Sequence, residues 1–128
     1  LAVQRLIQRE SLVSRVRDRG LALKRELRES LDRYDEVGDI RGRGFFIGIE
    51  LVRDRRTKQP FPADRRLGLE IGRHAFENGL ICYPCAGNVG GGVGDTIVIA
   101  PPYNATDAEL AELVAKFTLA VDSALKSG

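Results

Sequence analysis

The segment VGDIRGRGFFIGIELV, Val37–Val52, decides the fold class of this 128-residue chain. Gly38, Gly42 and Gly44 divide it into two short extended pieces, because glycine favours bends and turns. The second piece holds the nearly continuous apolar run Phe45–Val52, which predicts a strand buried on both faces. The segment therefore predicts a pair of strands in the first half of the chain.

Two arginines, Arg41 and Arg43, flank the bend between these strands. Their glycine neighbours indicate a tight turn whose backbone carbonyls need hydrogen-bond donors. We therefore expect both arginines to have structural roles.

Helical patterns lie on both sides of the strand pair. Residues 1–9 have the pattern of a helix end, and a second helix begins at Ser11. A third helix is predicted over Ala63–Asn78, and Gly79 is free to adopt a left-handed cap after it. A capping box, Thr106-x-x-Glu109, starts the last helix. The second helix carries one apolar stripe: Leu12, Val13, Val16, Gly20, Leu23, Leu27, Leu31 and Tyr34.

Two further short strands are predicted at Leu80–Tyr83 and Ile97–Ile99. The order of elements is typical of an α/β (α+β two-layer) domain. We expect a small, mainly antiparallel sheet with helices on one face.

The glycine-rich stretch GNVGGGVGD, Gly87–Asp95, has the composition of a phosphate-binding loop but lacks its context. Such a loop normally leads into a helix. Here the β-branched run Thr96–Ile99 predicts a strand, which Pro101 and Pro102 end. We therefore expect a loop in which the missing Cβ atoms allow mobility or a close approach.

The pair Cys82 and Cys85, in CYPC, could form a redox pair or half of a zinc site. A redox pair needs its first thiol at a helix N-terminus, but a strand pattern precedes this pair and Ala86-Gly87-Asn88 follows it. A zinc site needs two more ligands, and His74 is the single histidine. The default interpretation is two incidental thiols in a reducing cytoplasm.

Composition excludes several classes of protein. The 43% apolar and 30% charged residues are ordinary for a globular domain, and a net charge of +2 is too small for a nucleic-acid-binding surface. No apolar run approaches the roughly twenty residues of a membrane span. We expect a cytoplasmic protein that binds neither nucleic acid nor membrane. Because the chain begins with Leu1 inside a helical pattern and holds no Met, we also expect a piece of a longer protein.

No convincing nucleophile–base pair is present in the sequence. His74 lies on the polar side of its predicted helix, and the lysines fall on helix faces, in a charged loop and near the terminus: Lys24, Lys58, Lys116 and Lys126. A Schiff-base lysine requires an apolar pocket. We therefore expect no catalytic residue in this chain.

Three segments together resemble a known family: VGDIRGRGFFIGIELV, GLICYP and GDTIVIAPPYNATDAELAELV. Asp54, Thr57 and Pro60 lie between the first two. In this order and spacing they resemble the C-terminal domain of class III pyridoxal-phosphate aminotransferases, the fold-type-I group that includes ω-amino-acid and ornithine aminotransferases. The most specific elements are RGRGFFIGIEL and Gly94–Pro102.

The resemblance implies that residues 34–128 form the C-terminal small domain and that residues 1–33 are a helical segment leading out of a large pyridoxal-phosphate-binding domain. Members of the family are homodimers that transfer an amino group between an amine or amino acid and a keto acid. Their Schiff-base lysine, pyridine-pairing Asp and most phosphate contacts precede this domain. The resemblance therefore implies no cofactor-binding or metal-binding residue here, and an inactive fragment of a pyridoxal-phosphate enzyme.

The resemblance also implies that this domain helps to choose the substrate. Many relatives have an Arg two residues before APP, where this chain has Val98, and some have one shortly before GD, where Gly90–Val93 holds none. These differences predict an amine or ω-amino substrate, or a carboxylate bound by an Arg elsewhere. Gly91, Val98 and Pro101 are the predicted substrate-binding residues.

Two other functions are open. One is a non-catalytic module that binds a small ligand or dimerises. The other is a thiol redox protein, which requires a lowered pKa at Cys82.

Overall fold

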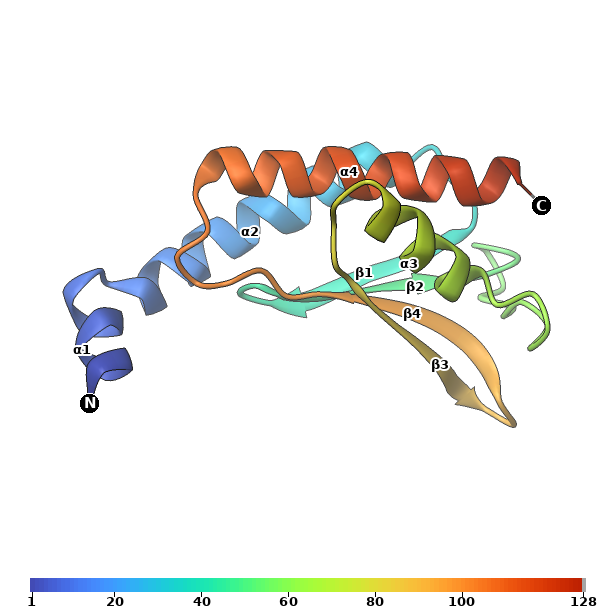
Figure 1. Ribbon diagram of the computed structural model, residues 1–128. Coiled ribbons are helices and arrows are strands. Elements are labelled where there is room, and N and C mark those ends of the chain that lie inside the picture. Colours follow the sequence, from blue (N-terminus) through green and yellow to red (C-terminus); the bar gives the residue numbers. More distant parts are fainter. Residues whose placement is uncertain (128) are drawn as a thin grey trace.

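The computed structural model describes residues 1–127 as two layers, a sheet and a set of helices that covers one face of it (Figure 1). The strands form one antiparallel sheet in the order β1-β2-β4-β3, which confirms the predicted fold class. They are β1 (Val37–Arg43), β2 (Phe46–Leu51), β3 (Tyr83–Gly90) and β4 (Val93–Ile99). The helices are α1 (Ala2–Arg9), α2 (Leu12–Leu31), α3 (Leu67–Glu77) and α4 (Asp107–Lys126).

The predicted strand pair is the β1–β2 hairpin, in which Arg43 pairs with Phe46 across a two-residue turn. Only the first central residue, Gly44, has a positive φ (+58°), as in a type II′ turn. The prediction that this second strand is buried on both faces is wrong. Ile47 and Ile49 are fully buried, whereas Phe46 is 67% exposed, because the helices cover only one face of the sheet.

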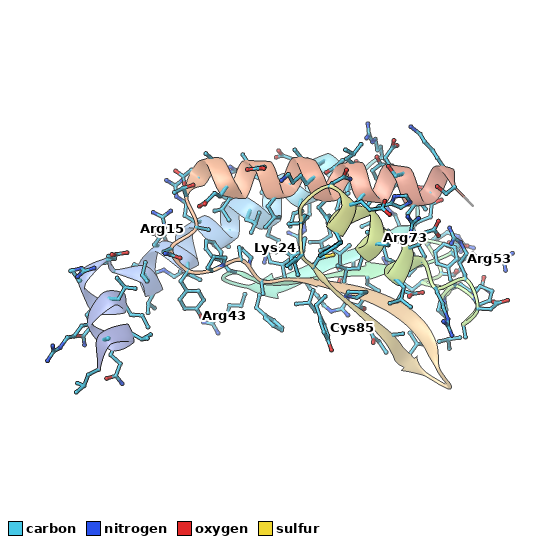
Figure 2. The ribbon with its side chains drawn as sticks, viewed as in Figure 1. Arg15, Lys24, Arg43, Arg53, Arg73 and Cys85 are labelled. Carbon is cyan, nitrogen blue, oxygen red and sulfur yellow. The ribbon has the colours of Figure 1, made fainter. Side chains whose placement is uncertain are left out.

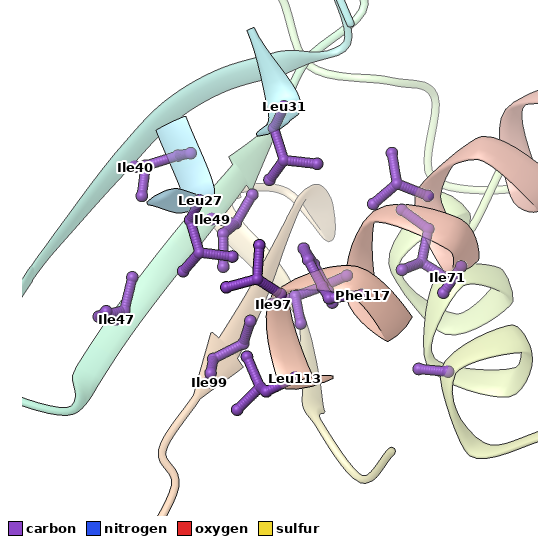
Figure 3. Close-up of a cluster of buried hydrophobic side chains, with 14 of the residues drawn as sticks. Leu27, Leu31, Ile40, Ile47, Ile49, Ile71, Ile97, Ile99, Leu113 and Phe117 are labelled. Carbon is purple, nitrogen blue, oxygen red and sulfur yellow. The ribbon is translucent and has the colours of Figure 1, made fainter. Parts of the chain in front are cut away.

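The core lies between the sheet and the helices (Figure 3). Isoleucines of β2 and β4 contribute the sheet side of the core, and Leu27, Leu31, Ile71 and Phe117 contribute the helical side. These four helical side chains are fully buried, and they come from α2, α3 and α4. The apolar stripe of α2 is therefore part of the same core as the sheet.

The end of α3 explains why the third strand begins later than predicted. Gly79 adopts the predicted left-handed conformation, with φ +77°. Its amide donates to the carbonyl of Phe76, and the amide of Leu80 donates to the carbonyl of Ala75 at 2.8 Å. This is a Schellman motif, which uses Leu80 to close the helix. The strand therefore starts at Tyr83 instead of Leu80.

The glycine-rich stretch is a β-hairpin, not a separate loop before a strand. Gly90 pairs with Val93, so Gly91 and Gly92 are the two central residues of the turn. Both have positive φ angles, +60° and +81°, which a type I′ turn requires. The hairpin tip bends away from the helical layer (Figure 1).

None of the helices within residues 1–127 is both long and apolar enough to cross a bilayer.

Candidate functional site

The sheet face turned away from the helices is the candidate site, and we call it the open face. Strand register places Arg41, Gly48, Val98 and Tyr83 in one row across all four strands. Val98 is half-buried in the centre of this row, and Tyr83 beside it is 70% exposed. Tyr83 was not among the predicted site residues; its alternation with the core-facing Cys82 and Pro84 is the signal that could have identified it.

The neighbouring row of the open face is polar: Asp39, Glu50, Thr96 and Cys85. Thr96 is buried, and its hydroxyl accepts a hydrogen bond from the side-chain amide of Asn88 on β3. This bond ties the irregular half of β3 to β4.

Arg41, in the first row, is neutralised by two carboxylates of the polar row. Its guanidinium is 2.5 Å from a Glu50 carboxylate oxygen and 3.2 Å from an Asp39 oxygen. The hydrogen bonds to Glu50 and Asp39 raise the pKa of Arg41 above its ordinary value. Arg41 therefore has a structural role, although it binds carboxylates and not the turn carbonyls that we expected.

Side chains of α2 donate hydrogen bonds to the carbonyls of this hairpin instead. The Lys24 ammonium donates to the carbonyl of Gly42 at 3.1 Å, and Arg28 donates to the carbonyl of Ile40 at 2.7 Å. Arg43, in contrast, makes neither a side-chain hydrogen bond nor an ion pair with any residue of the described range 1–127. The expected structural role of Arg43 thus has no contact to support it.

Pro101 follows β4 at the edge of the open face and lies between two hollows. One, of about 450 Å³, lies beside α4 and is lined by Leu80, Ile99 and Leu113. The other, of about 690 Å³, lies beside the β1–β2 turn. The structure therefore brings Val98 and Pro101 to the same end of β4.

Gly91 lies at the opposite end of that strand. It is seven positions from Val98, which corresponds to about 23 Å along an extended chain. A single small ligand in contact with Val98 does not reach the hairpin tip within this chain.

The cysteines do not have the properties of a redox pair. Both are free, and burial raises the pKa of Cys82 above its ordinary value. A raised pKa suppresses the thiolate that a redox cysteine needs. Cys82 precedes β3 and Cys85 lies within it, so neither thiol lies at a helix N-terminus.

Each lysine has a partner at the surface. Lys24 and Lys58 donate to carbonyls of β1, and Lys116 and Lys126 are each 2.6 Å from a carboxylate of α4. Lys116 also borders the hollow beside α4, but its partner Glu112 lies there with it. None of them is an isolated amine in an apolar pocket, the environment that a Schiff-base lysine needs.

His74 is mostly buried beside its own helix neighbours. One ring nitrogen is 3.4 Å from Glu77, and the other is 3.1 Å from the guanidinium of Arg73. Within residues 1–127, no group of three His, Cys, Asp or Glu side chains is placed to hold a metal ion.

Comparison with known proteins gives one consistent family. The family model described as aminotransferase class-III matches residues 1–121. An uncharacterised aminotransferase of Schizosaccharomyces pombe is 38% identical over 96% of this chain. The taurine–pyruvate aminotransferase of Rhodobacter capsulatus is 32% identical over 98% of it.

The fold has the same relatives. A solved structure of a PMP-bound aminotransferase from Vibrio fluvialis superposes with a TM-score of 0.82, at 26% identity over 95% of this chain and 25% of that one. The chain spans 27% of the length of the S. pombe relative and 26% of the R. capsulatus relative.

Proposed function

Because the chain belongs to the class III aminotransferases, we propose that it is the C-terminal small domain of an enzyme that moves an amino group between an amine or ω-amino acid and a keto acid. Residues 34–128 form this domain, and residues 1–33 lead out of a large domain, with their helix α2 packed into the core of the small domain. The observation that carries the proposal is the open face, where Val98 is half-buried in the centre of a row across all four strands. Pro101, three residues further along the chain, borders two hollows.

Pyridoxal phosphate is the cofactor that the family implies, and when bound it supplies an electron sink for carbanion chemistry. The lysines of this chain do not fit the group, since each donates to a carbonyl or a carboxylate. We therefore assign the Schiff-base lysine and the phosphate contacts to residues outside this chain and derive no step through the cofactor. On this proposal the chain alone is inactive.

The role of this chain is to select the substrate. Val98 offers an apolar surface in the centre of the open face, flanked by Gly48 and Tyr83. An apolar contact at this position favours an amine or ω-amino substrate over an α-carboxylate beside the reacting carbon. Pro101 fixes the chain where it leaves β4, and Gly91 approaches substrate only if the rest of the enzyme meets the hairpin tip.

The full-length enzyme is proposed to be a homodimer, as the family resemblance implies, and to be cytoplasmic, since the reducing cytoplasm keeps incidental thiols free. Sedimentation equilibrium of the full-length gene product tests the dimer, and a monomer at micromolar concentration contradicts it.

The visible spectrum of the full-length gene product, followed by borohydride reduction and peptide mapping, tests the cofactor assignment. We expect a yellow protein with the pyridoxyl label on a lysine outside residues 1–128. A colourless protein that does not bind pyridoxal phosphate contradicts the proposal and favours a small-ligand-binding or dimerisation module. A strict preference for α-amino acids that is lost on changing Val98 contradicts the substrate assignment but not the assignment to an aminotransferase.

A further inference from the structure

A groove lies where the start of α2, the β1–β2 turn and the segment after β4 meet. Its volume of about 690 Å³ is within the range of small-molecule sites. Much of its lining is apolar, including Val13, Phe46, Pro101, Pro102 and Tyr103. Phe46 and Tyr103 are at least half exposed, so their rings are available for contact.

The charge of this groove is entirely positive. The charged residues that line it are Arg17 and Arg43, with no acidic residue among them. Arg17 lies 3.3 Å from Asp18, in a pair whose side chains are both more than 70% exposed and therefore weakly bound. Arg43 has no partner among residues 1–127, and Figure 2 places it on the side of the sheet opposite α4.

Arg41 provides the comparison within the same strand. It lies two residues before Arg43 and points to the same face, but Glu50 and Asp39 already hold its guanidinium. Of these two arginines, only Arg43 is able to bind an external anion without breaking an ion pair. A guanidinium matches a carboxylate through two parallel hydrogen bonds.

The groove continues the candidate site. Arg43 pairs with Phe46, and Phe46 lies two residues along β2 from Gly48, the strand partner of Val98. A two-residue step corresponds to about 7 Å, which is within reach of an extended arginine side chain.

We infer that Arg43 binds the carboxylate of the substrate, while the apolar body of the substrate lies in the groove against Phe46, Pro101 and Tyr103. This inference rests on the proposed function and names its substrate class, a carboxylate separated from the amino or carbonyl group by an apolar chain. Either the ω-amino-acid donor or the acceptor can supply that carboxylate. Arg43 then determines specificity and does not touch the reacting atoms.

Single-turnover half-reactions of the full-length enzyme test the assignment. The donor arm compares 6-aminohexanoate with hexylamine, and the acceptor arm compares 6-oxohexanoate with hexanal on the aminated enzyme. We expect Arg43→Gln to lower kcat/KM about ten- to a hundredfold for the carboxylated member of at least one pair and to leave the neutral member within about twofold. Arg43→Lys retains part of the preference, since it keeps the charge but loses the planar fork.

The matched control is Arg25→Gln on α2, which removes one positive charge from a side chain 70% exposed and weakly paired with Glu29 at 3.8 Å. We expect it to leave all four rates unchanged. An Arg43→Gln variant that lowers both members of each pair equally, or lowers neither, overturns the inference. That result favours a groove filled by another part of the polypeptide.

Calorimetric titration with hexanoate provides a readout that does not depend on turnover. The full-length protein is expected to bind hexanoate, and Arg43→Gln is expected to weaken binding by about tenfold or more. If no amine reacts, the proposed function fails, and loss of hexanoate binding in Arg43→Gln still supports a carboxylate site. Equal binding by both proteins overturns that site.

Discussion

The carboxylate of Asp95 on β4 accepts a hydrogen bond from the backbone amide of Gly68, with 3.2 Å between the two atoms. Gly68 lies in the first turn of α3, and the residue preceding that helix, Arg66, makes no capping bond with its side chain. Asp95 therefore caps α3 from a distant strand, and its negative charge lies at the positive end of the helix dipole. Gly68 permits this approach, because an added Cβ would be 3.0 Å from the carboxylate oxygen.

Replacing Asp95 with Ala is expected to lower the free energy of unfolding by about 1–3 kcal/mol, because the buried amide of Gly68 loses its acceptor. Asp95→Asn keeps an acceptor oxygen and should lose less than half as much. Urea unfolding followed by circular dichroism measures both. Equal stability of Asp95→Ala and the wild type contradicts the capping role.

Local sequence predicted the elements whose stabilising groups lie within a few residues. The capping box of α4 is such a case, since Thr106 and Glu109 satisfy each other as predicted. The start of α3 could not be predicted in this way. The helix begins at Leu67 and not at the predicted Ala63, and its capping carboxylate comes from the distant strand β4. Contacts between residues far apart in the sequence therefore decide the boundaries that the pattern misplaces.

The sequence likewise predicted only part of the candidate site. The sequence selected Val98 and Pro101, which the structure brings to one end of β4, but it also selected Gly91 at the other end. It assigned Arg41 and Arg43 one shared role because both adjoin glycines. Their difference depends on Glu50, which only strand register places beside Arg41.

Gly20→Ala is expected to destabilise the protein by about 1–3 kcal/mol through overpacking. A Cβ on Gly20 would be 2.3 Å from the carbonyl oxygen of Gly44, so α2 and the β1–β2 turn would have to separate. At an exposed helical site the same change stabilises by about 1 kcal/mol, so the sign of the effect is diagnostic.

Ser14→Ala is the control for this experiment, since Ser14 is an exposed residue of the same helix. We expect it to change stability by no more than about 0.5 kcal/mol. A Gly20→Ala variant that is more stable than the wild type would show that α2 is not in close contact with the turn.

The β3–β4 turn requires glycine because of its backbone conformation and not because a larger side chain would clash. Gly91 and Gly92 have left-handed φ angles, and nothing lies within 4 Å of a Cβ added to either. Each Ala substitution is therefore expected to cost about 1–2 kcal/mol, and Gly91→Asn less, because Asn tolerates this region. Thermal unfolding measures the series.

Gly94 is the matched comparison in the same hairpin. Its φ is +98°, and an added Cβ would also be 2.7 Å from a methyl group of Val89. Gly94→Ala should therefore destabilise the protein more than Gly91→Ala. The reverse order would mean that the turn is not held in this conformation.

The capping box of α4 makes stability depend on pH. The Glu109 carboxylate accepts from the Thr106 amide at 2.7 Å and from its hydroxyl at 2.9 Å, and these bonds lower the pKa of Glu109 below its ordinary value of 4.5. A carboxyl with a lower pKa in the folded state contributes stability above its ordinary pKa and loses it as pH falls through the folded value.

Glu109→Gln is therefore expected to be less stable than the wild type at pH 7, and the difference should shrink as the pH falls below 4.5 and through the lowered pKa of the folded state. Urea midpoints measured from pH 7 to pH 3 test this. Both proteins retain some acid sensitivity, because hydrogen bonds from Thr57 and Lys126 lower the pKa of Asp54 and Asp122 respectively. A stability difference between Glu109→Gln and the wild type that stays constant with pH would refute the assignment to Glu109.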